Sequence, residues 1–112
     1  MAVSAEMMKG TVVPIILKLL SEKEMYGYEV IKVVNERTAQ ALEWKEGTIY
    51  PWLHRLEEDG LISSQWREST SGRRRKYYSL TRRGASELAT KVDEWQTLTK
   101  AVSAVLSLPL PA

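Results

Sequence analysis

The chain opens with apolar residues at helical spacing. Between positions 12 and 20 they share one broad face of a helix: Val12, Val13, Ile15, Ile16, Leu19 and Leu20. This spacing predicts a first helix over roughly residues 5 to 20, with its apolar stripe turned to a core. Pro14 interrupts the segment, and because proline lacks a backbone N–H we expect it to bend the helix.

A second helical pattern follows a short polar turn at residues 21–25. From Tyr26 to Val34, the residues Val30, Ile31 and Val34 fall on one face and are expected to point inward. The polar residues of this segment are expected on its solvent side: Glu29, Lys32 and Glu36.

Turn and cap residues delimit a third helix in the middle of the chain. Thr48 is a suitable N-cap, which places Pro51 in the first turn, where a missing N–H costs little, and Gly60 just past the end. At 100° per residue, three apolar residues gather on one side of this helix: Ile49, Leu53 and Leu56. The opposite side is left free, and it carries Thr48, Pro51, His54 and Arg55.

Two alternating segments then predict a pair of strands. Residues 61–68 place Ile62 and Trp66 on one face, and residues 76–80 place Tyr78 and Leu80 on one face, with a turn at residues 69–72. Such short strands are not stable alone, so we expect them to lie against the helices through Trp66 and Tyr78.

A long helix is predicted from Thr81 to about Leu106, beyond what a three-helix core needs. Its apolar seam has the 4-3-4-3-4 spacing of a coiled coil, with one polar member: Leu88, Val92, Trp95, Thr99, Val102 and Leu106. A second copy of the chain is the simplest partner for such a seam, which predicts a homodimer. Light scattering that found only monomer would contradict this prediction.

The charge distribution separates one segment from the rest of the chain. Between Leu61 and Gly84 there are seven basic residues and one acid, an excess of six, whereas the whole chain carries a net charge of +2. Four of the basic residues are consecutive: Arg73, Arg74, Arg75 and Lys76. A helix followed by a basic hairpin is typical of a winged helix-turn-helix, and such a concentration of charge indicates a phosphate-facing surface. The alternative is a solvated, mobile loop.

The exposed side of the third helix is the candidate for reading base edges in a major groove. It carries Thr48, Tyr50, Pro51, His54 and Arg55, with Lys45 just before it. Arg55 could hold guanine with two donors, and Thr48 or Tyr50 could bind a phosphate near the helix N-terminus. For His54 an ordinary surface position remains open. For Arg82 and Arg83, at the start of the last helix, the alternatives are an arriving anion and tolerated surface charge.

Composition excludes several classes of function. There is no cysteine and one histidine, so thiol chemistry and disulfides are excluded, and no cofactor or metal site is expected. No nucleophile with a base, no carboxylate pair and no glycine-rich phosphate loop is present, so we do not expect an enzyme. Residues 57–59, all acidic, are interpreted as a solvated helix end. No signal peptide or membrane span is found, which favours a cytoplasmic protein.

Three motifs in order resemble the PadR family of bacterial transcriptional regulators. They are Tyr26-Gly27-Tyr28-Glu29-Val30, the segment from Glu46 to Ile62 (EGTIYPWLHRLEEDGLI), and the segment from Gly72 to Gly84 (GRRRKYYSLTRRG). Together they cover most of the chain. The resemblance implies a mainly α protein with a small β-hairpin: a winged helix-turn-helix over residues 1–80, a dimerisation helix over 81–106 and a tail over 107–112.

The resemblance also implies a function. Such a protein would be a homodimeric repressor that binds an inverted-repeat operator in double-stranded DNA, with Arg73 to Tyr77 of each wing along phosphates or in the minor groove. The short C-terminal segment is similar to the compact branch of the family, which implies a flat aromatic effector stacked on Trp95, with Val13 and Pro14 beside it. Plain packing of Trp95 is the alternative. Two rival functions stay open: a winged-helix module that binds RNA or acidic protein, and a small-molecule carrier.

Overall fold

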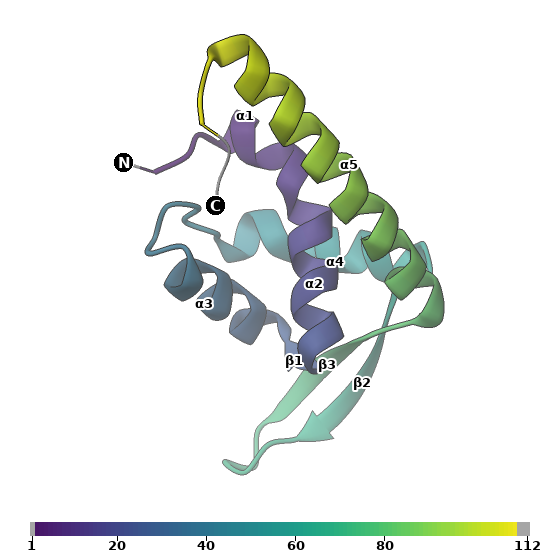
Figure 1. The fold of residues 1–112 in the computed structure, drawn as a ribbon. Coiled ribbons are helices and arrows are strands. Elements are labelled where there is room, and N and C mark those ends of the chain that lie inside the picture. Colours follow the sequence, from purple (N-terminus) through teal and green to yellow (C-terminus); the bar gives the residue numbers. More distant parts are fainter. Residues whose placement is uncertain (1, 110–112) are drawn as a thin grey trace.

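The computed structural model describes residues 2–109, in which a small sheet lies at one end of a group of helices (Figure 1). In chain order the elements are α1 (Ala5–Met8), the 3-10 turn η1 (Lys9–Thr11), α2 (Val12–Glu22), β1 (Met25–Tyr26), α3 (Gly27–Arg37), α4 (Glu46–Glu58), β2 (Ile62–Glu68), β3 (Arg74–Leu80) and α5 (Arg82–Leu106). The strands form an antiparallel sheet in the order β1-β3-β2. Strands β2 and β3 make a hairpin, the wing, that projects from the helices (Figure 1). The predicted fold class, mainly helical with a small hairpin and a long last helix, is confirmed.

The predicted first helix is divided in two. α1 ends at Met8 and η1 leads into α2, so the change of direction lies at Lys9–Thr11. Pro14 explains the break, because it has no N–H to donate to the Gly10 carbonyl and its ring would crowd that carbonyl in a continuous α-helix. The bend expected from Pro14 is present, and it falls one turn before the proline.

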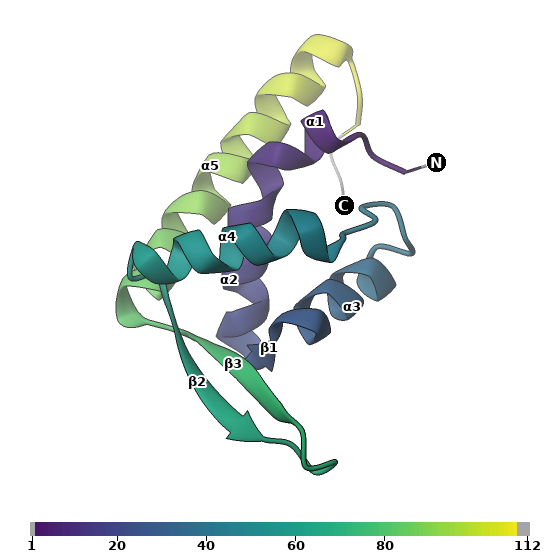
Figure 2. The same ribbon diagram turned by 180° about the vertical axis from the view of Figure 1, so that it is seen from behind.

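The core is built around α2, which lies between α5 and α4 (Figures 1 and 2). The inward residues predicted for the first three helices are mostly buried, and they join residues of the loop and sheet. The buried set is Val12, Ile16, Leu17, Leu19, Leu20, Met25, Val30, Ile31, Val34, Trp44, Ile49, Leu53, Leu56, Ile62 and Tyr78. This continuous apolar cluster fixes how the helices and the sheet sit on one another.

The third helix begins earlier than predicted. α4 starts at Glu46 and is preceded by Lys45 in an extended conformation, so Thr48 lies within the first turn and the prediction of Thr48 as the N-cap is wrong. Pro51 is then inside the helix, where the Gly47 carbonyl receives no hydrogen bond from it. The end of the helix is as predicted.

The loop before α4 is held rigidly, which explains the early start. The Asn35 side chain accepts a hydrogen bond from the Trp44 backbone N–H at 2.7 Å and donates one to the Trp44 carbonyl at 3.0 Å. Three non-glycine residues in the loop have left-handed backbones: Ala39, Gln40 and Glu43, with φ of 49°, 67° and 45°. Such backbone angles persist only where the surroundings impose them, and here they set the direction in which α4 leaves the loop.

The sheet differs from the prediction in three respects. β1 was not predicted, and it pairs Met25 with Tyr78 and Tyr26 with Tyr77 along the inner edge of β3. β3 begins at Arg74, two residues early, so most of the basic run lies in a strand and not in the turn. Tyr78 is buried as predicted, but Trp66 is 57% exposed, so the prediction that Trp66 packs on the helices is wrong. Trp66 lies beyond the helices because β2 extends past them.

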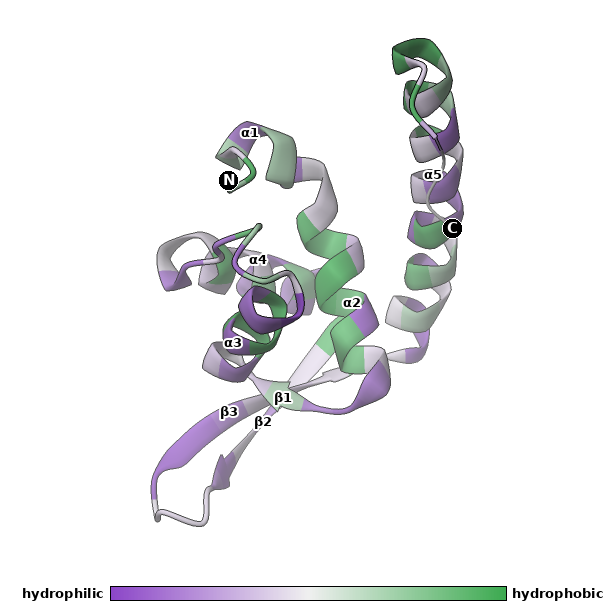
Figure 3. Ribbon diagram, turned by 60° about the vertical axis from the view of Figure 1, so that its left-hand side comes forward, coloured by the Kyte–Doolittle hydropathy of each residue, from purple (hydrophilic) through white to green (hydrophobic). Residues whose placement is uncertain are grey.

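The last helix begins where predicted. Thr81 is its N-cap and its hydroxyl accepts a hydrogen bond from the Gly84 N–H at 3.0 Å. Gly84 is buried against Leu61, and Leu88 packs on the core. Farther along, α5 stands away from the other helices and its surface mixes apolar and polar side chains (Figure 3). Within residues 2–109, no helix combines the length and apolar character that crossing a membrane requires.

Candidate nucleic-acid interface

The wing and the start of α4 enclose a groove of about 620 Å³. Its walls come from β3, from Trp66 of β2, and from the N-terminal ends of α3 and α4. The lining residues are Tyr26, Gly27, Tyr28, Glu46, Tyr50, Trp66, Arg73, Arg74, Arg75, Lys76 and Tyr78. The groove therefore brings the beginning of α4, through Glu46 and Tyr50, next to the basic segment.

The free face of α4 matches the prediction. Pro51, His54 and Arg55 are all exposed, whereas the apolar residues of the same helix are buried. The His54 imidazole lies 3.6 Å from Glu58, and the Arg55 guanidinium lies over the Trp52 ring at 5.3 Å. These side chains are available to a duplex laid along α4.

The remaining predicted residues of α4 have more specific surroundings. Lys45 and Thr48 line a second hollow, of about 430 Å³, between α1 and the start of α4. The Tyr50 ring packs so closely on Gly27 that a Cβ there would lie 2.7 Å from Tyr50 Cε1. Burial raises the pKa of Tyr50 above its ordinary value, and its hydroxyl is a hydrogen-bond donor at neutral pH, as that of any tyrosine is. The ring thus joins α3 to α4 and leaves its polar end at the groove.

Of the three arginines of the wing, Arg74 and Arg75 lie over aromatic rings and Arg73 does not. Arg73 lies in the turn and is exposed, Arg74 lies over the Trp66 ring at 5.6 Å, and Arg75 lies over the Tyr26 ring at 4.3 Å. Among residues 2–109 no carboxylate forms an ion pair with these three arginines. Their charge is therefore free to meet phosphates, and cation–π contacts keep two of them in place.

Lys76 is bound within the protein. Its Nζ lies 3.1 Å from Glu57 Oε1, and Glu57 also accepts a short hydrogen bond from the Ser64 hydroxyl. The hydrogen bond from Ser64, together with Lys76, lowers the pKa of Glu57, so the carboxylate stays charged until the pH falls below its ordinary range. The interpretation of residues 57–59 as a merely solvated helix end is wrong for Glu57, which faces the wing.

A second carboxylate holds the opposite face of the wing. Arg67 Nη2 donates to Glu24 Oε2 at 2.7 Å, and the Ser79 hydroxyl donates to the same oxygen at 3.3 Å. The hydrogen bond from Arg67 is the main cause that lowers the pKa of Glu24. On this face Tyr77 packs edge-on against Tyr26, with ring centroids 5.6 Å apart. Tyr77, predicted to follow the DNA, is thus also part of the wing's attachment.

Sequence reasoning missed the aromatic lining of the groove. Tyr28 and Trp66 are more than half exposed there, and neither was predicted to lie at the interface. The alternation of β2 gave the correct face for Trp66 but not its distance from the helices. The sequence does not show that Trp66 packs against the Arg74 guanidinium of the partner strand and not against the helical core.

The arginines at the start of α5 are separate from the groove. Arg82 and Arg83 are both exposed, and Arg83 Nη1 lies 3.6 Å from the position a Gly60 Cβ would occupy. The guanidinium is therefore at the C-terminal end of α4, where helix carbonyls favour a cation. This position gives Arg83 a structural role that requires no bound anion.

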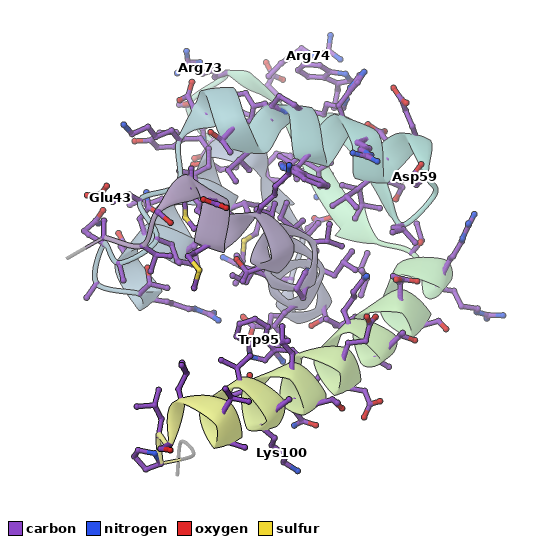
Figure 4. The ribbon with its side chains drawn as sticks, turned by 90° about the horizontal axis from the view of Figure 1, so that it is seen from above. Glu43, Asp59, Arg73, Arg74, Trp95 and Lys100 are labelled. Carbon is purple, nitrogen blue, oxygen red and sulfur yellow. The ribbon has the colours of Figure 1, made fainter. Side chains whose placement is uncertain are left out.

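A third hollow, of about 570 Å³ and almost wholly apolar, lies between α5 and the first helices. Pro14 and Trp95 line it, as predicted, together with Val92, whereas Val13 is absent from the lining and packs against the core. Trp95 points from α5 toward the first helices (Figure 4). In the same view Arg73 and Arg74 lie beyond α4, on the other side of the body, so the hollow and the groove are on opposite faces.

This arrangement defines a winged-helix DNA-binding protein, in which α3 and α4 form the helix-turn-helix and β2 with β3 form the wing. Residues 16–90 match the family described as "Transcriptional regulator PadR-like family". The chain belongs to this family, as the three sequence motifs suggested. It is accordingly a DNA-binding transcriptional regulator and not an enzyme.

Solved structures support the assignment across nearly the whole chain. A transcriptional regulator from Clostridium thermocellum is 36% identical, with a TM-score of 0.82 over 89% of this chain and 97% of that one. A PadR-like transcriptional regulator from Bacillus cereus is 32% identical, with a TM-score of 0.80 over 91% of this chain and 97% of that one.

Two named relatives are longer proteins. The "Negative transcriptional regulator PadR" of Bacillus subtilis is 33% identical over 73 residues, which is 65% of this chain and 40% of that protein. "Transcriptional regulator YqjI" of Escherichia coli is 32% identical over 90 residues, 80% of this chain and 42% of that protein. The chain thus spans about two-fifths of each of these relatives.

Proposed function

We propose that the protein is a repressor that binds an inverted-repeat DNA operator as a homodimer, and that an apolar small molecule releases it. The observation that carries the proposal is that the beginning of α4 and the three wing arginines, Arg73 to Arg75, line one groove. The Bacillus subtilis relative is named a negative transcriptional regulator, which supports repression. Binding to chromosomal DNA would place the protein in the cytoplasm.

In the proposed complex each α4 enters a major groove, and the two grooves are one helical turn apart. Pro51, His54 and Arg55 would face base edges, because they form the exposed side of α4. The start of α4, with Lys45, Thr48 and Tyr50, would lie at a phosphate, which a helix N-terminus favours. Arg73, Arg74 and Arg75, with Tyr77, would follow the sugar-phosphate backbone from the wing.

The seam of α5 supports the proposed dimer. Of its six members, Val92, Trp95, Val102 and Leu106 are exposed, with Trp95 at 48%, and Leu98 and Val105 beside them are exposed as well. So large an apolar surface on one helix favours a protein partner. The proposed division follows from this: residues 1–80 bind DNA and residues 81–106 pair, although Leu88 also ties α5 to the core. The tail over 107–112 has residues 110–112 outside the described part of the chain.

Val102→Glu is expected to break the dimer, because two carboxylates would be forced together in an apolar seam. Light scattering at micromolar concentration should change from the dimer mass to the monomer mass. Footprinting on the promoter of the protein's own gene should change from two protected half-sites about one helical turn apart to none.

Thr97→Glu is the matched control, because Thr97 is exposed on α5 and lies away from the seam. It should keep both the dimer mass and the paired footprint. A monomeric wild-type protein, or a Val102→Glu protein that remains a dimer, would refute the proposed role of the seam.

The apolar hollow beside Trp95 supports the proposed effector site, since planar apolar molecules fit cavities of this size and lining. Trp95→Ala is expected to weaken the binding of a planar dye at least about tenfold, because stacking and burial on the indole are lost. Fluorescence titration measures the affinity, and light scattering verifies that the variant is still a dimer. Unchanged dye binding by a dimeric Trp95→Ala protein would leave Trp95 with a packing role alone.

A further inference from the structure

Two carboxylates from the body of the protein hold the wing, one on each face. On the α4 side Glu57 contacts Ser64 of β2 and Lys76 of β3. On the other side Glu24, just before β1, contacts Arg67 of β2 and Ser79 of β3. Each carboxylate therefore joins both strands of the wing to the helical body.

The Glu57 contact is special because Glu57 belongs to the reading helix itself. It lies two residues after Arg55 and three after His54, but on the side of α4 that faces the wing. The covalent connection from α4 to β2 is the short turn at residues 59–61. The Glu57 contacts add a second, non-covalent attachment, from the penultimate residue of α4 to Ser64 of β2 and Lys76 of β3. The two attachments together restrict the angle between α4 and the wing more than the turn alone.

The same contact changes the charge that the wing presents. The Lys76 side chain is only 28% exposed, and its ammonium is already paired with Glu57, whereas the three preceding arginines have no carboxylate partner in the described residues. Counterions leave DNA when a cationic side chain neutralises a phosphate. A lysine whose charge is already balanced by a carboxylate neutralises no phosphate, so it adds nothing to this release. The sequence prediction that Lys76 contacts DNA therefore conflicts with its surroundings.

We propose that Glu57 is a positioning residue for DNA binding, which sets the angle between α4 and the wing and withholds Lys76 from phosphate. The inference rests on the proposed contact of the wing with DNA. Without Glu57 the wing would move relative to α4 and gain one free cation. Non-specific affinity would then rise, and the advantage of the operator over random duplex would fall.

The test measures the salt dependence of binding to a random-sequence duplex by fluorescence anisotropy. Glu57→Gln should steepen the slope of log affinity against log salt by about 0.9, the contribution of one added phosphate contact. Glu58→Gln is the matched control, because it removes the same charge one residue along, and within residues 2–109 the one ion pair of Glu58 is with His54 and not with the wing. Its slope should equal that of the wild type.

Lys76→Gln separates this inference from a merely structural role. Alone it should leave the wild-type slope unchanged, and combined with Glu57→Gln it should return the slope to the wild-type value. A slope that becomes shallower by about 0.9 in Lys76→Gln alone would show that Lys76 already contacts phosphate, and would overturn the inference.

Hydrogen exchange of residues 62–80 in the free protein tests the attachment independently of DNA. Glu57→Gln should speed exchange in the wing relative to Glu58→Gln, and equal exchange in the two variants would overturn the positioning role. If the wild-type protein bound no duplex at all, the proposed function would fail, and the role of Glu57 in DNA binding would fail with it. The exchange result would still show whether Glu57 holds the wing.

Discussion

Gly84→Ala is expected to lower the free energy of unfolding by about 3 kcal/mol or more, because there is no room for the added methyl group. A Cβ at this position would lie 2.0 Å from the Leu61 carbonyl oxygen and 2.7 Å from Leu80 Cδ1. The obstacle is backbone, which no rotamer change relieves. The first turn of α5 would have to move away from the start of β2. Urea unfolding followed by circular dichroism measures the effect.

Gly47→Ala provides the comparison, since Gly47 is also helical and a Cβ there would meet nothing within 4 Å. Alanine is the better helix former, so this variant should be as stable as the wild type or more stable by up to about 1 kcal/mol. A Gly84→Ala protein as stable as Gly47→Ala would mean that Gly84 does not lie against the Leu61 backbone as described.

Replacing Arg73 and Arg74 together by glutamine is expected to weaken DNA binding roughly fiftyfold at about 0.1 M salt, because two phosphate contacts are removed. The slope of log affinity against log salt should become shallower by about 1.8. Both side chains are exposed and neither packs in the core, so the folded structure should persist. Anisotropy titrations at several salt concentrations, with an operator and with a random duplex, give both quantities.

The double variant Lys91→Gln/Lys100→Gln removes the same charge from α5, and neither lysine lines the groove. Lys100 lies on the other side of the body from Arg73 and Arg74 (Figure 4). This control should change the affinity little, because neither lysine lines the groove and salt screens charges that do not contact the duplex. Equal losses of DNA affinity in the two double variants would indicate a general effect of net charge. They would contradict the proposed contact between the wing and phosphate.

The parts of the fold that depend on hydrophobic periodicity and on cap or turn residues were predicted well from the sequence. Ile49, Leu53 and Leu56 are buried, and Gly60 has the left-handed backbone expected of a helix end, with φ of 77°. The last helix was predicted from Thr81 to about Leu106, and α5 spans Arg82–Leu106 with Thr81 as its N-cap. These features depend on near neighbours along the chain, and so the chain's own pattern was sufficient to find them.

The errors concern interactions between residues far apart in sequence. β1 exists because Met25 and Tyr26 find a partner edge on β3, more than fifty residues away, and two residues alone carry no strand pattern. The start of α4 depends on the Asn35 contacts with Trp44 across the loop. The pairing of Lys76 with Glu57 needs the twist of the wing relative to α4, which periodicity does not encode.

The length of α5 has a mechanical consequence. Its 25 residues make a rod about 37 Å long that is anchored near Gly84, with Trp95 about halfway along. A tilt of ten degrees at the anchored end would displace the far end by about 6 Å, more than one rise of a helical turn. In the proposed dimer the two α5 helices pair with each other, so a molecule wedged at the midpoint would change the angle between each α5 and its own helical body. The same lever would then move the two bodies, and with them the two reading helices, relative to each other by enough to miss consecutive grooves.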